Sequence, residues 1–301
     1  MIDQVFDAAP YLTDEQRIKS IKAKLFIQHD FVELALKRMK RLANLEEHEE
    51  RENLIITGDS GAGKSTIAER FRDTFPCLCD PDSDANVVPV IYVSLPARPT
   101  LAGLCSEILD VLMEPRKDST PERQLVQSVL KLLRTVGTRV LIIDEMQDMQ
   151  RARPTEKEVL RNFIKSVGAK CNLSLVLVGM PDLLSVISAS RQLSRRFDIL
   201  ASPPWKYDER GSNLLYHLEP MLLLKHPSNL ADDRKMGEWI FDRSEGTLGD
   251  TLKILRLAAE HAIRTGEERI TMKTLNAIDF TRFTKRSEVG MRKTGLVKSG
   301  K

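Results

Sequence analysis

The segment from Leu54 to Ser65, LIITGDSGAGKS, constrains the fold of this chain more than any other segment. Leu54, Ile55 and Ile56 are typical of a buried parallel strand, and a glycine-rich loop follows them. The loop matches Gly-x4-Gly-Lys-Ser, a pattern that turns backbone N–H groups toward phosphates and leads into a helix N-terminus. The segment therefore predicts a strand, a phosphate-binding loop and a helix, in that order.

The residue types of this loop predict ATP and Mg²⁺ as ligands. The pattern places Lys64 at the β- and γ-phosphates and makes the Ser65 hydroxyl a ligand of Mg²⁺. A helix-like stretch from Thr66 to Thr74 follows, so the context agrees with the motif, and a plain glycine-rich turn would not need the Lys-Ser ending. The predicted nucleotide-binding residues are Gly58, Asp59, Ser60, Gly61, Ala62, Gly63, Lys64, Ser65 and Thr66.

Two adjacent carboxylates at the end of another apolar run form the second motif. Asp144 and Glu145 follow Val140-Leu141-Ile142-Ile143 directly. Because open α/β sheets bind ligands at the carboxyl ends of their strands, we expect the pair beside the phosphate loop. We expect Asp144 to hold Mg²⁺, directly or through water, and Glu145 to polarise the attacking water. An apolar strand ending in Asp is common, but the alternation of strands and helices after a phosphate loop favours this role.

The order of elements predicts an α/β fold, a parallel sheet flanked by helices and followed by a small helical lid. Apolar runs predict strands at residues 54–56, 90–94, 140–145, 173–179 and 199–205. Helical spacing and caps predict helices at residues 31–45, 66–74, 101–113, 121–134, 156–167 and 183–189. The expected domains are an N-terminal helical extension 1–50, a nucleotide-binding domain 51–205, a lid 206–278 and a basic tail 279–301.

Composition favours an ordinary soluble protein over a membrane or disulfide-rich one. The chain has 301 residues, 42% hydrophobic and 30% charged, and no apolar run reaches the ~20 residues that a membrane span needs. We therefore expect a cytoplasmic protein. Its four cysteines, Cys77, Cys79, Cys105 and Cys171, lack zinc-site spacing and are expected to be reduced thiols. The basic tail is expected either to contact nucleic acid or an acidic partner, or only to keep the chain soluble.

A pair of arginines stands far from the phosphate loop in the sequence. Arg195 and Arg196 precede Phe197 after the fourth predicted strand. We expect them to serve the nucleotide of a neighbouring subunit, and the alternative is that they pair with surface acids. With Lys64 and Glu145, they complete the predicted catalytic set.

With these motifs in place, the chain resembles the AAA+ ATPases and, among them, the TniB/TnsC group of transposition helper ATPases. The resemblance covers nearly the whole chain and rests on several segments beyond the nucleotide motifs. These are Ala9-Pro10-Tyr11, Arg17-Ile18-x-x-Ile21, Phe26-Ile27-x-His29, Arg51-Glu52-Asn53-Leu54, Leu177-Val178-Gly179-Met180-Pro181, Leu193-Ser194-Arg195-Arg196-Phe197 and Glu245-Gly246-x-x-Gly249.

The resemblance implies a function in DNA transposition. Proteins of this group bind ATP, assemble as rings or helical filaments on duplex DNA, and connect a DDE-type transposase to a TniQ-like target selector. It implies that Gly58 to Ser65 is Walker A, that Asp144 and Glu145 are Walker B, and that Arg195 or Arg196 is the finger offered to the next subunit. DNA would be held through its phosphates without base readout. Candidate contacts are Arg98, Thr100 and Lys117.

Two departures from the group's pattern predict a low rate of hydrolysis. Gly179-Met180 stands where a polar sensor is usual, so that Ser174 or no residue would take the sensor role. Asp250 replaces a lid arginine, so that Lys253 or Arg256 would have to substitute for it.

Three alternatives stay open: a replication-initiator or clamp-loader relative, a small-molecule phosphotransferase, and an ATP-binding scaffold without turnover. An initiator usually carries a separate duplex-reading domain after the lid, and fewer than 25 residues follow Ala277 here.

Overall fold

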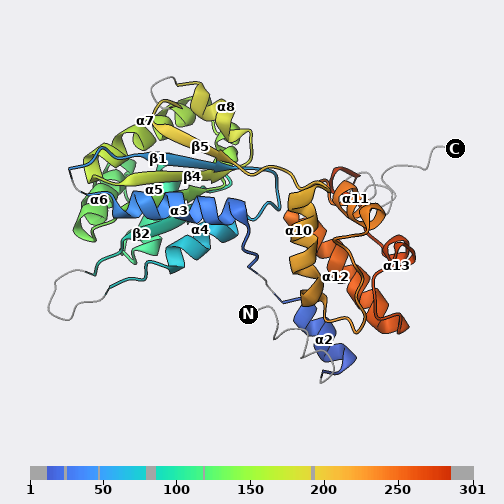
Figure 1. Ribbon diagram of the computed structural model, residues 1–301. Coiled ribbons are helices and arrows are strands. Elements are labelled where there is room, and N and C mark those ends of the chain that lie inside the picture. The colour runs from blue at the N-terminus through green and yellow to red at the C-terminus, as the bar shows by residue number, and fades with distance from the viewer. Residues whose placement is uncertain are drawn as a thin grey trace. The chain divides into compact units, whose positions relative to one another are not determined.

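The computed structural model describes residues 12–23, 26–46, 48–78, 86–117, 119–190 and 194–285 (Figure 1). Its contacts divide the chain into two units, a sheet unit, Gln28–Ser202, and a helical unit, Met1–Ile27 with Pro203–Lys301. The chain therefore passes between the units twice. The expected extension 1–50 is split between them, because its first helix packs in the helical unit and its second in the sheet unit.

The sheet unit is built on five parallel strands in the order β2-β3-β4-β1-β5, which confirms the predicted sheet. The strands are β1 Asn53–Thr57, β2 Val90–Ser94, β3 Val140–Asp144, β4 Ser174–Gly179 and β5 Phe197–Ala201. Strands β3 and β4 are buried along their whole length, as expected of apolar runs in a covered parallel sheet. Strand β5 ends earlier than predicted, before Pro203-Pro204, whose rings remove the N–H groups that a further pairing would need.

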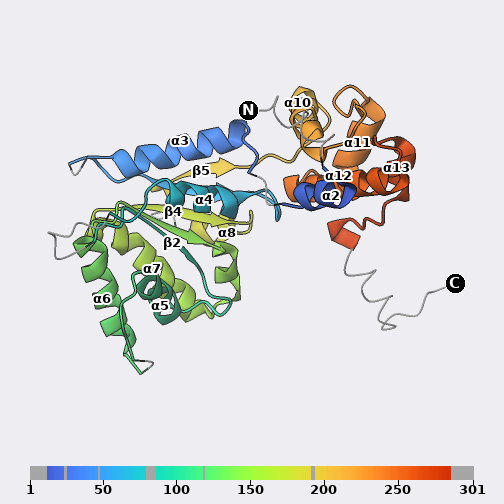
Figure 2. The ribbon, with the colours of Figure 1, turned by 90° about the horizontal axis from the view of Figure 1, so that it is seen from below.

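Helices cover both faces of this sheet (Figure 2). On one face lie α3 Asp30–Asn44 and α4 Lys64–Asp73, which pack on Ile56, Ile142 and Val178. On the other face, Ile55, Leu141 and Leu177 pack with a larger set of helices. That set is α5 Leu101–Val111, α6 Glu122–Thr135, α7 Pro154–Cys171 and α8 Leu183–Ser188. Successive strand residues thus serve opposite layers, as the pleat requires.

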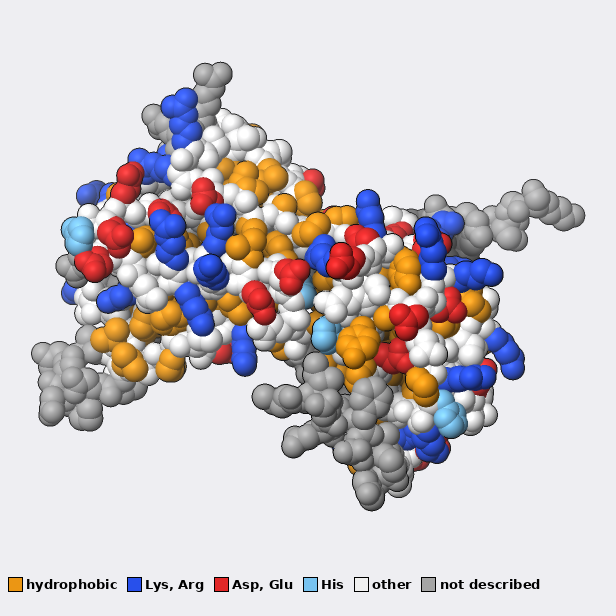
Figure 3. All heavy atoms as spheres, in the orientation of Figure 1, with side chains coloured by type: hydrophobic (Ala, Val, Ile, Leu, Met, Phe, Trp, Pro, Cys, Tyr) orange, Lys and Arg blue, Asp and Glu red, His pale blue; other side chains and the backbone are white. Residues whose placement is uncertain are grey.

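Helix α3 is amphipathic in the sense that its sequence predicts. Phe31, Ala35 and Met39 are buried against the sheet. Its outer side carries exposed basic residues, and the face in Figure 3 shows Lys and Arg side chains gathered over this helix. These residues are Lys37, Arg38, Lys40 and Arg41.

The helical unit has its own apolar core. Its elements are α2 Asp14–Ile21, α10 Glu209–Leu218, η3 Glu219–Leu222, α11 Arg234–Arg243, α12 Leu248–Thr265, α13 Met272–Ala277 and η4 Phe283–Lys285. Ile18 and Ile21 of α2 pack in this core with Leu255 and Ala259 of α12. No described helix of either unit is both long and apolar enough to span a membrane.

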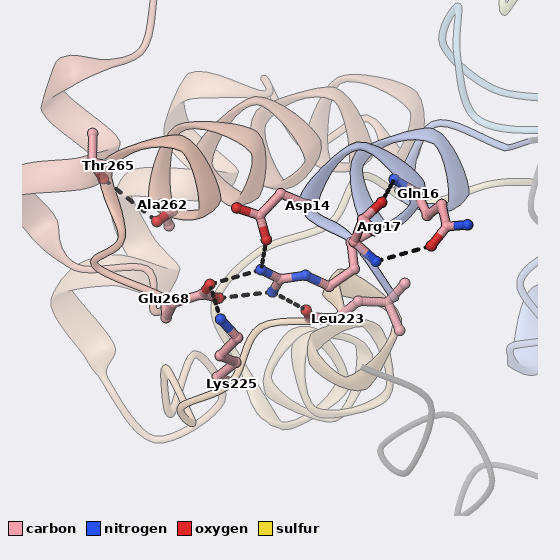
Figure 4. Close-up of polar contacts among 9 residues, drawn as sticks. Asp14, Gln16, Arg17, Leu223, Lys225, Ala262, Thr265 and Glu268 are labelled. Carbon is pink, nitrogen blue, oxygen red and sulfur yellow. Dashed lines mark hydrogen bonds and ion pairs between the residues drawn. The ribbon is translucent and has the colours of Figure 1, made fainter. Parts of the chain in front are cut away.

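A buried ion pair fastens α2 to the rest of the helical unit (Figure 4). The Arg17 side chain is fully buried, and its guanidinium donates to both carboxylate oxygens of Glu268, at 2.8 and 2.7 Å. It also donates to Asp14 at 2.7 Å and to the Leu223 carbonyl at 3.0 Å, while Lys225 Nζ lies 3.0 Å from Glu268. The first helix of the chain is thereby tied to the turn after α12.

We expect acid to destabilise the helical unit through Glu268. Hydrogen bonds from Arg17 hold the pKa of the Glu268 carboxyl at about 2, below its ordinary 4.5. Because the folded-state pKa is the lower one, the stabilisation is complete above the ordinary pKa of 4.5 and is lost as the pH falls toward about 2. Thermal unfolding followed by tryptophan fluorescence should show a falling midpoint across this window. The Glu268→Gln variant should show a flatter profile, and an equally steep one would contradict the assignment.

Candidate functional site

The phosphate loop joins the end of β1 to the start of α4 in a conformation that requires glycine at two places. Gly61 and Gly63 have φ angles of 78° and 83°, in the left-handed region that other residues rarely adopt. Gly63 is the N-cap of α4 and offers no capping side chain. The first N–H groups of this helix are therefore left for an anion, with the helix dipole in support.

The structure brings the two sequence motifs together around one cavity of about 230 Å³. Its walls come from the phosphate loop, the end of β3 and the end of β4. The lining residues are Ser60, Gly61, Gly63, Lys64, Ser65, Thr66, Asp144, Glu145, Gln147, Gly179 and Met180. Of the predicted nucleotide-binding residues, Gly58, Asp59 and Ala62 belong to the loop but do not line this cavity.

Lys64 is buried inside the phosphate loop, and its ammonium contacts the loop backbone. It is 8% exposed, and its Nζ donates to the Asp59 carbonyl at 2.8 Å. Burial lowers the pKa of the Lys64 ammonium, and the nearby carboxylates of Asp144 and Glu145 offset part of this effect. The site thus contains a buried cation that an incoming phosphate would stabilise.

Asp144 is a buried carboxylate oriented by two hydrogen bonds. It is 2% exposed, its Oδ2 accepts from the Tyr92 hydroxyl at 2.8 Å, and its Oδ1 accepts from the Glu145 N–H at 2.7 Å. Burial and the Asp144 charge raise the pKa of Tyr92, so this hydroxyl stays a donor. Sequence reasoning missed Tyr92, because a single tyrosine in a strand carries no signal of its partner.

These residues fit Mg²⁺ by the chemistry of their donors. Among the described residues Asp144 forms no ion pair, its nearest cation being the Lys64 ammonium that lines the same cavity, and the Ser65 hydroxyl lines that cavity too. Each carboxylate oxygen keeps a second lone pair. The described part of the chain holds no cluster of three or more His, Cys, Asp or Glu side chains. Mg²⁺ needs no such cluster, since one or two protein ligands with phosphate oxygens and waters suffice.

Glu145 and Gln147 form a pair that the sequence did not reveal. Glu145 has a positive φ of 56° and is the N-cap of η2, Met146–Arg151. Gln147 Nε2 donates to a carboxylate oxygen of Glu145, and Gln147 Oε1 accepts from the Met180 N–H at 3.0 Å. The only sequence signal is a polar residue two places after the carboxylate pair. Ser174, the sensor suggested by sequence, is the first residue of β4. It therefore lies at the end of that strand away from the cavity, which Gly179 lines at the other end.

Arg195 and Arg196 lie at the amino-terminal ends of the sheet strands, whereas the phosphate loop lies at the carboxyl ends. They are exposed and directly precede β5, whereas the loop follows the carboxyl end of β1, and the two strands are parallel. Both line a second cavity of about 720 Å³. Arg196 Nη1 donates to the Lys165 carbonyl at 3.2 Å, and neither arginine forms an ion pair with a described acid. The structure therefore does not bring them to the loop of their own chain.

The candidate DNA contacts differ in their availability. Arg98 is exposed in the turn after β2, and Lys117 is exposed after α5. The Thr100 hydroxyl instead caps α5 by accepting from the Gly103 N–H at 3.0 Å. In the basic tail, Arg282 pairs with Asp242, and residues 286–301 lie outside the described residues, as do Ala9-Pro10-Tyr11, Cys79 and Leu193. No disulfide joins the described cysteines, Cys77, Cys105 and Cys171, to one another.

Lys253 and Arg256, suggested in place of a lid arginine, both belong to α12. Arg256 donates to the Ala23 carbonyl at 2.6 Å, and Lys253 Nζ lies 5.9 Å from the centre of the Phe280 ring. Each of these contacts stays within the helical unit.

Comparisons with known proteins show the family of this chain and its fold. The model of the family described as "Bacterial TniB protein" matches residues 17–207. Among solved structures, the ORC1 protein of Aeropyrum pernix in complex with DNA has a TM-score of 0.55 at 18% identity and covers 90% of this chain and 69% of its own. The ORC2 protein of the same organism, in ADPNP-ADP complexes, has a TM-score of 0.52 at 18% identity. The match covers 81% of this chain and 64% of the ORC2 chain.

The RuvB Holliday junction branch migration motor of Thermotoga maritima has a TM-score of 0.51 at 16% identity and covers 85% of this chain and 71% of its own. This chain thus spans about two thirds of the length of the solved chains that it resembles. No curated protein matches it by sequence.

Proposed function

This chain belongs to the TniB family, and on that basis we propose that it is an ATPase that assembles on duplex DNA and assists DNA transposition. Its fold is that of the AAA+ P-loop ATPases, a class of nucleotide-hydrolysing proteins. The observation that supports the proposal most is the single cavity lined by Lys64, Ser65, Asp144 and Glu145. Two carboxylates, one cation and one hydroxyl, the groups that phosphoryl transfer needs, thus lie together at the N-terminus of α4.

In this proposal each residue has one chemical task. Lys64 binds the β- and γ-phosphates, and Ser65 and Asp144 hold Mg²⁺. When bound, Mg²⁺ neutralises charge on the phosphate oxygens. Glu145 accepts a proton from the water that attacks the γ-phosphate. Tyr92 orients the Asp144 carboxylate by its hydrogen bond to Oδ2.

Assembly follows from the position of the two arginines. Because Arg195 and Arg196 are exposed at the amino edge of the sheet, we propose that one of them contacts the γ-phosphate held by a neighbouring copy. ATP would then join two copies, and its hydrolysis would remove the contact and loosen the assembly. A ring and a helical filament both satisfy this requirement.

Duplex DNA is the proposed binding partner on which the copies assemble. They would hold it through its phosphates without base readout. The ORC1 protein that shares this fold was solved in complex with DNA. Exposed Arg98 and Lys117 are the proposed contacts, with a smaller part for Thr100, whose hydroxyl already caps a helix. A DDE-type transposase and a TniQ-like target selector are the proposed protein partners.

We expect assembly on DNA to depend on ATP. In size measurements and electron microscopy with duplex DNA, wild-type protein should form large particles with ATP and Mg²⁺ but not with ADP. Lys64→Ala should stay small with either nucleotide, because the buried cation that binds the phosphates is gone. Arg195→Ala or Arg196→Ala should bind ATP normally and fail to assemble.

Arg123→Ala is the matched control, since it removes the same charge from an exposed position on α6. It should assemble as wild type does. A protein that stays monomeric and ignores DNA with every nucleotide would refute the proposal. Phosphate contact also requires DNA affinity to fall as salt rises, and a salt-independent affinity would contradict that part.

A further inference from the structure

We propose that Gln147 is the residue that positions Glu145 for reaction with water, in place of a polar side chain at the end of β4. The inference rests on the proposed ATPase function and adds a positioning residue to its site. Gln147 lines the same cavity as Lys64 and Asp144, so it lies where it could serve this reaction.

The orientation of the Gln147 amide is determined by its two partners. The Met180 N–H can only donate, so the atom of Gln147 that faces it at 3.0 Å must be the carbonyl oxygen Oε1. The NH₂ group then faces the carboxylate of Glu145, which can only accept while it is ionised. Reversing the amide would set donor against donor and acceptor against acceptor. Gln147 therefore bridges Glu145 and the end of β4 in one orientation.

Glu145 needs such a partner because nothing else in the described structure holds its carboxylate. Its backbone is restrained, since its N–H donates to Asp144 and its carbonyl accepts from the Asp148 N–H at 2.9 Å. The residue is nevertheless exposed, and it forms no ion pair with a described Lys or Arg. A free carboxylate on a long side chain would sample several rotamers. The hydrogen bond from Gln147 selects one of them.

Gly179 makes room for this bridge. A Cβ atom on Gly179 would lie 2.8 Å from Gln147 Oε1 and 3.3 Å from the Gln147 backbone nitrogen. The φ angle of Gly179 is not positive, so its lack of a side chain, and not its backbone freedom, is what the structure uses. Gly179 stands where a polar sensor side chain is usual, at the end of β4. Its lack of a side chain leaves space for the Gln147 side chain from η2.

The test compares Gln147→Met with Gln150→Met. Methionine keeps the length and packing of glutamine and removes both hydrogen bonds. Gln147→Met should lower kcat for ATP about 10- to 100-fold, less than loss of Glu145 itself, and should leave the KM and the ATP affinity within about twofold. Gln150 lies in the same short helix and, within the described structure, donates to the Asp182 carbonyl and Ser185, at 3.2 and 3.4 Å, so Gln150→Met should keep wild-type kcat.

Gly179→Ala is a second arm, and it should lower kcat in the same way because the new methyl displaces the flexible end of Gln147. A merely structural role would let Gln147→Met keep its turnover. An unchanged kcat in Gln147→Met would therefore overturn the inference, as would a loss confined to ATP affinity. If Glu145→Gln also leaves turnover unchanged, the proposed hydrolytic function fails and not this inference alone.

A measurement without nucleotide keeps the inference testable if turnover is low. The side-chain amide signal of Gln147 in a ¹⁵N NMR spectrum, identified by its loss in Gln147→Met, should shift strongly in Glu145→Ala and weakly in Asp148→Asn. An amide signal that ignores Glu145→Ala would show that the two side chains do not interact, and the inference would fall.

Discussion

Replacing Glu145 by glutamine is expected to lower ATP turnover at least about a hundredfold while leaving ATP binding close to wild type. Glutamine has nearly the shape of glutamate but cannot accept a proton from water at neutral pH. The Lys64 ammonium, which is proposed to bind the phosphates, is unchanged. Phosphate release under saturating ATP and Mg²⁺, together with fluorescent ATP binding, measures both quantities.

The same variant should assemble on duplex DNA and stay assembled, because the γ-phosphate proposed to join neighbouring copies is no longer removed. Dilution or an ADP chase should dissolve wild-type particles and spare those of Glu145→Gln. Glu158→Gln is a suitable control, since Glu158 is exposed on α7 and lies outside the cavity. Equal turnover in Glu145→Gln and wild type would reduce the protein to a nucleotide-binding scaffold.

Replacing Arg17 by methionine is expected to destabilise the helical unit by about 3–5 kcal/mol. The substitution leaves the Glu268 carboxylate, which is 8% exposed, without its bidentate partner. Lys225 stays near it but is itself 52% exposed and supplies a weaker contact. Both tryptophans, Trp205 and Trp239, belong to the helical unit, so their fluorescence during denaturant unfolding reports on this unit alone.

Two further variants separate loss of charge pairing from loss of packing. Arg264→Met removes the ion pair of an exposed arginine with Glu260 on α12 and should cost less than about 1 kcal/mol, because Glu260 keeps its ion pair with Lys22. The double variant Arg17→Met with Glu268→Met should recover most of the stability lost in Arg17→Met, because no buried charge is left unpaired. If the double variant is as unstable as Arg17→Met, packing of the arginine stem and not the ion pair holds α2 in place.

Local sequence patterns were sufficient for most of the sheet unit. Four strands were predicted to within one residue of their bounds, since each is a short apolar run bounded by glycine, proline or polar residues. The fifth was predicted at residues 199–205 but lies at Phe197–Ala201, and it includes the polar Asp198. The glycines of the phosphate loop were equally readable, because positive φ angles restrict the residue type at Gly61 and Gly63. The predicted proximity of Asp144 to the loop followed from one rule, that parallel strands present their carboxyl ends at one edge.

The side chains that support the site could not be read in the same way. Tyr92 meets Asp144 across 52 residues of sequence, and Gln147 meets Met180 across 33. Neither contact follows from a local period or a motif. The division of residues 1–50 between two units was missed for a similar reason, because the partner of Arg17 is Glu268, 251 residues away.

Short segments of the chain therefore carry their own chemistry: a loop shaped by glycines, a strand that ends in carboxylates, and helices with one apolar side. The contacts between distant groups follow only from the packed fold. In it, Gln147 bridges Glu145 and Met180, and Arg17 is buried against Glu268. Arg195 lies at the opposite ends of the strands from the phosphate loop. The difference lies in the sequence separation of the interacting groups. Backbone conformation responds to neighbouring residues, whereas a hydrogen bond between distant side chains exists only after the core has packed and set their distance.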